Sequence, residues 1–172
     1  FSVFKNPIIH LGLEVKDEEI KKYNQFTRVM GKCNIPICSL AWQPDGAVRS
    51  WHKVGKHSRG SVTGIVDMEE LDARGYSHDR FYSKEEIWEN FKYFLDRTLP
   101  VAEECNVKMA LHPNDPPASC VMGVSSLIYT TEDFKRAFEI ADNSPYLGMK
   151  LCVGCWLEGG RQFGKLYEDI RY

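Results

Sequence analysis

The sequence predicts an α/β fold of about four consecutive strand–helix units. Short apolar runs alternate with amphipathic stretches of helical period, and 43% of the 172 residues are hydrophobic, as in ordinary globular domains. Strands that alternate with helices run parallel, because each helix crosses back over the sheet. We expect one domain over residues 1–172, in which the sheet is either open and doubly wound or part of a (β/α)₈ barrel. A complete barrel typically needs about 250 residues.

The first part of the chain contains two predicted strands and one helix. Residues 8–13 are apolar and predict an opening strand. Residues 16–33 place apolar side chains at helical spacing and begin with acidic residues, which the helix dipole favours there. Residues 35–42 predict a buried strand, with Pro36 tolerated near its beginning. No Gly-x-Gly-x-x-Gly motif follows the first apolar run, so a dinucleotide-binding fold has no support.

Residues 43–81 form a long polar, glycine-rich segment. A structureless connection of this length is unusual inside a compact domain and often serves as a functional lid or binding loop. The segment is therefore interpreted as a long loop or lid, with a disordered insertion as the alternative.

The second part of the chain continues the alternation of strands and helices. A capping box from Ser83 to Glu86 begins an amphipathic helix, which Pro100 should kink or restart. The remaining expected elements are a strand at 107–111, a helix at 131–141, a strand at 147–152 and a helix at 162–172.

Composition excludes several classes of function. The formal net charge is −2 and the basic residues are interleaved with acidic ones, so we expect no nucleic-acid partner. No apolar run approaches the roughly 18 residues that span a bilayer, so we expect no membrane association. The six cysteines lie mostly within or beside apolar runs, as reduced buried thiols do. A reduced cytoplasmic protein is the expectation.

Both ends of the chain are abrupt. Phe1 is not an initiator methionine, and Tyr172 lies inside a helix-like pattern. We expect the chain to be a fragment that is inactive by itself.

The active site of a parallel α/β fold lies at the carboxyl ends of its strands. His112 ends one predicted strand and Cys152 ends the next, so the two side chains can converge on one metal ion. Imidazole and thiolate both suit zinc, iron and related ions. The alternative for His112 is a structural hydrogen bond.

Cys152 and Cys155 form a Cys-x-x-Cys pair with two further interpretations. A structural zinc site would need a second pair at suitable spacing, which Cys33 and Cys38 do not provide. A redox pair would need a helix directly after the motif, whereas Gly159 and Gly160 precede the expected helix.

Two motifs together resemble the mannonate dehydratase family. The first is His-Pro-Asn-Asp-Pro-Pro at 112–117, and the second is Gly-x-x-x-Cys-x-Gly-Cys-Trp at 148–156. Similarity extends over 88–110 and, more weakly, over 21–42 and the Arg59–Gly60 loop. The combination of the two motifs is far more specific than either alone.

The resemblance implies a partial (β/α)₈ TIM barrel of the xylose isomerase-like superfamily. It implies a lyase that dehydrates the sugar acid D-mannonate to 2-keto-3-deoxygluconate with a divalent metal. That metal is Mn²⁺ in most of the family, with Fe²⁺, Co²⁺ or Zn²⁺ as alternatives. His112 and Cys152 would be metal ligands, whereas a further His, an Asp and the catalytic Tyr would come from later strands. A homo-oligomer is expected for the full-length protein.

The same resemblance gives the candidates for substrate binding, Arg49, Asn114 and Asp115. An arginine can hold a carboxylate bidentately, although Arg49 also fits an ordinary solvated loop residue.

Two positions depart from the family pattern. The family usually has Asp in place of Asn114 and Arg in place of Ser126. These changes leave two alternatives to the dehydratase: a non-catalytic or degraded sugar-binding homologue, and a metal-dependent sugar isomerase of the same superfamily. The isomerase would need carboxylate ligands at the first three strand ends, where the sequence has none.

Overall fold

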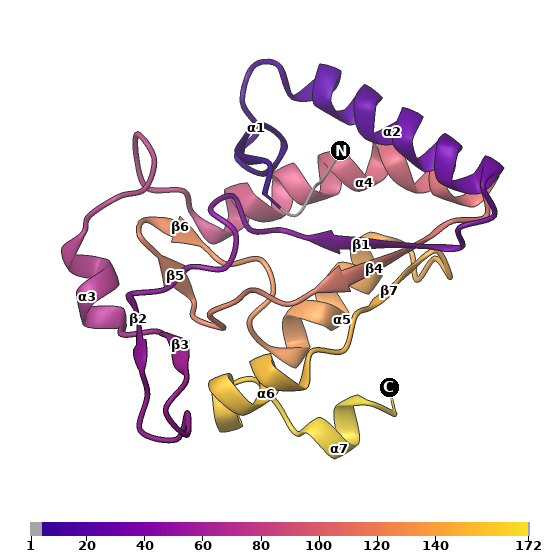
Figure 1. Ribbon diagram of the computed structural model, residues 1–172. Coiled ribbons are helices and arrows are strands. Elements are labelled where there is room, and N and C mark those ends of the chain that lie inside the picture. Colours follow the sequence, from indigo (N-terminus) through magenta and orange to yellow (C-terminus); the bar gives the residue numbers. More distant parts are fainter. Residues whose placement is uncertain (1–4, 172) are drawn as a thin grey trace.

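The computed structural model describes residues 5–171 (Figure 1). Its central sheet has three parallel strands in the order β1-β4-β7, where β1 is Ile37–Ala41, β4 is Lys108–His112 and β7 is Leu147–Met149. The α/β class is confirmed for the described residues. The expected count of about four units is not confirmed, because one expected strand is helical.

The chain opens with a helix where the sequence predicts a strand. Helix α1, Pro7–His10, overlaps the first half of the apolar run at 8–13. The Asn6 side chain accepts a hydrogen bond from the Ile9 N–H (3.1 Å), and Pro7 occupies the first turn, where its missing N–H costs nothing. These start signals outweigh the strand propensity of the isoleucines.

Helices cover one face of the sheet. Helix α2, Lys16–Lys32, and helix α4, Lys84–Glu104, pack side by side against it (Figure 1). Helix α4 continues through Pro100 to Glu104 and does not restart there. The helix-facing side chains of the strands include Leu40 and Leu111, both fully buried.

The opposite face of the sheet remains open. Ser39, Ala110 and Gly148 pair in register across the three strands, and Ser39 is exposed. Side chains alternate between faces along a strand, so His112 shares this open face with Ala110.

The segment 43–81 contains regular structure. Strands β2, Trp51–Val54, and β3, Val62–Ile65, form an antiparallel hairpin, and helix α3, Met68–Ala73, follows. The Ser50 hydroxyl fastens the hairpin by donating to the Asp67 carbonyl (2.9 Å) and accepting from its N–H (2.8 Å). The expectation of a structureless loop is therefore wrong, while a lid function stays a prediction.

The expected helix at 162–172 is replaced by shorter elements that begin earlier. Helix α6 is Val153–Gly159, a 3₁₀ turn follows over Gly160–Gln162, and helix α7 is Leu166–Asp169. Strand β7 also stops at Met149, short of the expected 152. Helix α6 consequently begins immediately after Cys152.

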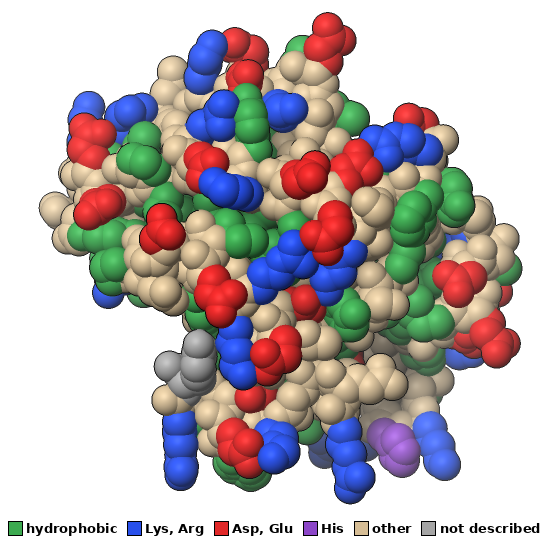
Figure 2. Space-filling model, turned by 180° about the vertical axis from the view of Figure 1, so that it is seen from behind, with side chains coloured by type: hydrophobic (Ala, Val, Ile, Leu, Met, Phe, Trp, Pro, Cys, Tyr) green, Lys and Arg blue, Asp and Glu red, His purple; other side chains and the backbone are tan. Residues whose placement is uncertain are grey.

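Two further short strands lie beyond β4. Strands β5, Cys120–Val121, and β6, Val124–Ser125, pair antiparallel. On the face shown in Figure 2, basic and acidic side chains are interleaved rather than gathered by sign. Among the described residues, no helix combines the length and the apolar character needed to cross a bilayer.

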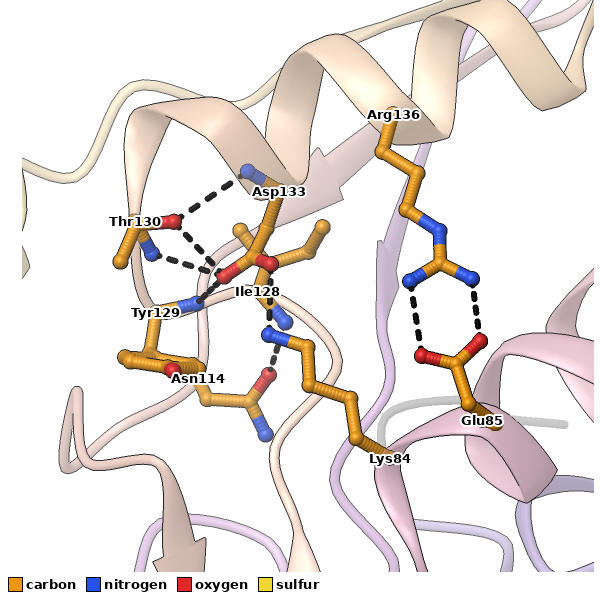
Figure 3. Close-up of polar contacts among 8 residues, drawn as sticks. All are labelled: Lys84, Glu85, Asn114, Ile128, Tyr129, Thr130, Asp133 and Arg136. Atoms are coloured by element: carbon orange, nitrogen blue, oxygen red, sulfur yellow. Dashed lines mark hydrogen bonds and ion pairs between the residues drawn. The ribbon is translucent and has the colours of Figure 1, made fainter.

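A buried carboxylate joins the starts of two helices (Figure 3). Asp133, in helix α5 (Thr131–Ile140), accepts an ion-paired hydrogen bond from Lys84 at the start of α4 (2.6 Å). Its second oxygen accepts from the N–H groups of Tyr129 and Thr130 (3.1 Å each) and from the Thr130 hydroxyl (2.9 Å). One carboxylate thus caps α5 and fixes α4 against it.

Replacing Asp133 with Ala is expected to lower the free energy of unfolding by about 2–4 kcal/mol, because it removes a helix cap and leaves a partly buried lysine unpaired. Urea denaturation measures the change. Glu132→Ala is the matched control, because the Glu132 side chain is 77% exposed against 10% for Asp133, and should cost less than about 0.5 kcal/mol. Equal losses in the two variants would contradict this role.

Candidate functional site

His112 and Cys152 meet at the carboxyl end of the sheet. His112 is the last residue of β4, and Cys152 lies three residues beyond the end of β7. Their ligand atoms, together with the Sγ of Cys155, all lie within 4.8 Å of one another. The structure therefore brings together the two residues predicted as metal ligands, although the ligand role itself stays a prediction.

The His112 ring is oriented by its neighbour in the chain. Its Nδ1 lies 2.6 Å from the Pro113 carbonyl oxygen, which can only accept, so Nδ1 carries the proton in this bond. The lone pair of the neutral ring then belongs to Nε2. Burial lowers the pKa of His112, and the nearby charge of Lys150 lowers it further. The neutral imidazole, the form that binds metals, is therefore favoured.

Cys155 adds a third possible metal donor, a sulfur, beside His112 and Cys152. The sequence analysis did not include it among the metal ligands. It lies in the first turn of α6, where its N–H donates to the Cys152 carbonyl (3.0 Å). Burial, followed by the proximity of Cys152, raises the pKa of the Cys155 thiol. The Cys-x-x-Cys spacing could have indicated that Cys155 lies near Cys152. Gly159 and Gly160 suggested that no helix follows the motif directly, so helix α6, which buries Cys155, was not predicted.

Arg49 and Asp115 are bound to each other. The guanidinium donates to both carboxylate oxygens of Asp115 at 2.8 Å, and it also donates to the Val48 carbonyl (2.8 Å). This pair ties the base of the β2–β3 hairpin to the turn after β4, beside a cavity of about 500 Å³. Glu158 also lines this cavity, and its pKa is raised by burial and then by Asp115. Substrate binding by Arg49 and Asp115 stays a prediction.

Asn114 lies in the same turn, with its amide engaged by the backbone. Its Nδ2 donates to the Trp42 carbonyl (3.2 Å), and its Oδ1 accepts from the Ile128 N–H (2.9 Å; Figure 3 shows the latter bond). The Asn114 N–H donates to the Ile128 carbonyl (2.7 Å). The residue therefore fastens the end of β1 to the segment before α5, and its role in substrate binding stays a prediction.

Asn114→Ala is expected to lower the free energy of unfolding by about 1–3 kcal/mol, because a buried N–H and a buried carbonyl lose their partner. Chemical denaturation provides the measurement. Asn24→Ala, which removes one hydrogen bond to the Arg97 carbonyl at the exposed helix surface, should cost less than about 1 kcal/mol. A larger loss for Asn24→Ala would refute the assignment.

Comparison with known proteins identifies the family. A family model described as D-mannonate dehydratase (UxuA) matches residues 65–160, more than half of the chain. The chain belongs to the mannonate dehydratase family.

Several mannonate dehydratases match most of the chain. That of Thermotoga neapolitana is 31% identical over 198 residues, covering 95% of this chain and 53% of its own length. That of Endomicrobium trichonymphae is 44% identical over 179 residues, covering 85% of this chain and 48% of its own. The crystal structure of mannonate dehydratase from Streptococcus suis serotype 2 is similar with a TM-score of 0.77 and 29% identity, over 97% of this chain and 50% of that one. The chain spans about half the length of these relatives.

The two positions that depart from the family resemblance share a cavity. Asn114 and Ser126 line one small cavity of about 30 Å³.

Lys150 is a further residue of the site that the sequence analysis missed. Its N–H extends the β4–β7 pairing by donating to the Leu111 carbonyl (2.8 Å), and its ammonium donates to the Ser39 hydroxyl (3.1 Å). The side chain thus crosses the open face of the sheet that also carries His112. Its position two residues before Cys152 was the available signal, because residues two apart share a strand face.

Proposed function

We propose that this chain supplies part of the active site of a metal-dependent sugar-acid dehydratase that converts D-mannonate to 2-keto-3-deoxygluconate. The observation that carries the proposal is the meeting of the His112 imidazole and the Cys152 thiol at neighbouring strand ends, inside a mannonate dehydratase fold. The proposed substrate is a small sugar acid, and the proposed assembly of the complete protein is a homo-oligomer.

The donors present fit a divalent metal. Imidazole and thiolate suit Fe²⁺, Co²⁺ and Zn²⁺, and Mn²⁺ is the ion that the family resemblance favours. His112 and Cys152 would hold it, with further donors supplied from outside this chain, since catalytic sites normally use three protein ligands. A bound divalent ion would act as a Lewis acid toward the negative charge that develops when a proton is removed next to a carboxylate.

The remaining residues would bind and orient the substrate. Lys150 places an ammonium group on the same face as His112, where it can attract the substrate carboxylate. Arg49 lies at the edge of the site, where it forms an ion pair with Asp115. This ion pair would hold the β2–β3 hairpin in place. We propose that residues 43–81 cover the site when substrate is bound.

The test uses the complete natural polypeptide that contains these residues. We expect it to form 2-keto-3-deoxygluconate from D-mannonate with added Mn²⁺, and to lose this activity with a chelator and in the His112→Ala variant. The 172-residue chain alone should be inactive. Turnover that is indifferent to both the chelator and the variant would overturn the proposal.

Replacement of Lys150 by Met is expected to raise KM for D-mannonate roughly 10-fold or more, because a hydrogen bond to a charged group contributes about 1.5–3 kcal/mol. Steady-state kinetics on the complete polypeptide measure the change. Lys150→Arg keeps the positive charge and should recover much of the loss, whereas an unchanged KM in Lys150→Met would exclude a role in substrate binding.

A non-catalytic sugar-acid-binding protein is the second candidate. Asn114 and Ser126, at one cavity, carry it, because they replace a carboxylate and a guanidinium of the usual family pattern. Binding of D-mannonate by calorimetry with no product formed would favour this alternative over the dehydratase.

A further inference from the structure

Cys152 and Cys155 are positioned to react with each other. Cys152 is the N-cap of α6, and Cys155 follows within its first turn. The two Sγ atoms lie within 4.8 Å of each other, so modest side-chain rotation brings them toward the ~2.05 Å of a disulfide. The strand–Cys-x-x-Cys–helix context that the sequence analysis found missing is therefore present, since β7 precedes the motif and α6 begins within it.

We propose that Cys152 and Cys155 form a dithiol–disulfide pair that a hydroperoxide oxidises. Both thiols are free in the structure. Cys152 is half-buried at the open end of the sheet, whereas Cys155 is only 2% exposed. A small oxidant therefore meets Cys152 first, and Cys155 is the thiol that resolves the product.

The chemistry balances in two steps. The Cys152 sulfur, as thiolate, attacks one peroxide oxygen, the O–O bond breaks, and the sulfenic acid forms as hydroxide or alcohol leaves. The Cys155 sulfur then attacks the Cys152 sulfur, forms the S–S bond and expels the sulfenic oxygen as water. Two thiols are oxidised by two electrons, and one equivalent of hydrogen peroxide is reduced to two of water.

Oxidation also removes a metal donor. A disulfide sulfur carries no thiolate charge, so the oxidised pair would leave His112 as the one remaining member of the three-donor group described above. Metal binding and disulfide formation would therefore exclude each other. This second consequence rests on the proposed function, whereas the disulfide itself does not.

The test treats the complete natural polypeptide, free of metal, with hydrogen peroxide. We expect peptide mass spectrometry to find a 152–155 cross-link with a mass loss of two hydrogens, removed by dithiothreitol. Calorimetric binding of Mn²⁺ and Zn²⁺ should disappear on oxidation and return on reduction. Saturating Zn²⁺ beforehand should slow cross-linking.

Two variants control the experiment. Cys155→Ser should form no such cross-link, and its metal binding should return incompletely after peroxide, because Cys152 oxidises past the sulfenic acid without a partner. Cys120→Ser should behave as the unsubstituted protein. Absence of the 152–155 cross-link would overturn the proposal. A cross-linked protein that binds metal as tightly as the reduced one would support the disulfide and overturn its exclusion of the metal. Cross-linking in a protein that binds no metal even when reduced would support the cysteine pair and reject the metal site.

Discussion

Replacing His112 with Ala in the complete polypeptide is expected to weaken metal binding by more than about 100-fold. Loss of a group that only orients a metal ligand already costs roughly 10–100-fold in affinity, and this substitution removes a ligand. Cys152→Ala should have an effect of the same order. Titration calorimetry with Mn²⁺ and Zn²⁺ measures both changes.

The matched control for the metal experiment is His57→Ala. His57 is exposed on the turn of the β2–β3 hairpin, outside the three-donor group of His112, Cys152 and Cys155. Its replacement should leave metal affinity unchanged within about twofold. Tight binding that survives in His112→Ala would show that the metal lies elsewhere in the protein.

Phe91→Ala is expected to lower the free energy of unfolding by about 3–5 kcal/mol, the range found for removal of a buried aromatic side chain. Phe91 is fully buried, and its ring meets those of Trp42 (5.0 Å between centroids) and Trp88 (6.0 Å) in edge-to-face contacts. Trp42 directly follows β1, so the cavity left by the substitution would loosen the strand end beside the site. Urea denaturation measures the loss.

Two substitutions bracket this effect. Phe91→Leu retains most of the buried volume and should cost less than Phe91→Ala. Phe81→Ala removes the same atoms from a side chain that is 47% exposed, and it should change the stability by less than about 1 kcal/mol. If Phe81→Ala proved as costly as Phe91→Ala, burial would not be the cause.

The elements with strong local signals could be predicted from the sequence. Apolar residues at helical spacing predicted α2, and the Ser83 cap predicted the start of α4, where the Ser83 side chain accepts from the Glu86 N–H. Strand β4 and the strand-end position of His112 followed from the apolar run at 107–111. Because parallel strand ends converge, the meeting of His112 with Cys152 could also be anticipated.

The errors fall where local signals compete or where distant residues decide. The apolar run at 8–13 suits a strand as well as a buried helix, and the Asn6–Pro7 start determined the outcome. In the sequence, Gly159 and Gly160 indicate a break before the next helix. In the structure, Gly159 ends α6 and Gly160 follows it with a positive φ of 56°. Neither glycine prevents a helix from starting at Val153.

Long-range partners were beyond the reach of local patterns. The Asn114 side-chain amide donates to the backbone carbonyl of Trp42, which follows another strand, and accepts from the Ile128 N–H. The Arg49 guanidinium likewise forms an ion pair with Asp115, a residue distant in the sequence. A sequence alone indicates which groups can form such bonds, but the partner is chosen only when the sheet assembles.

The order of the strands has a consequence for how the site forms during folding. His112 and Cys152 belong to neighbouring strands, β4 and β7, that are joined through α5, whereas β1 reaches β4 only across the hairpin, α3 and α4. The entropic cost of closing a loop rises with its length, so the β4–β7 closure is the less costly of the two. The donors His112, Cys152 and Cys155 therefore depend on the strand pairing that closes the shorter loop. They can come together before β1 pairs with β4 and completes the sheet.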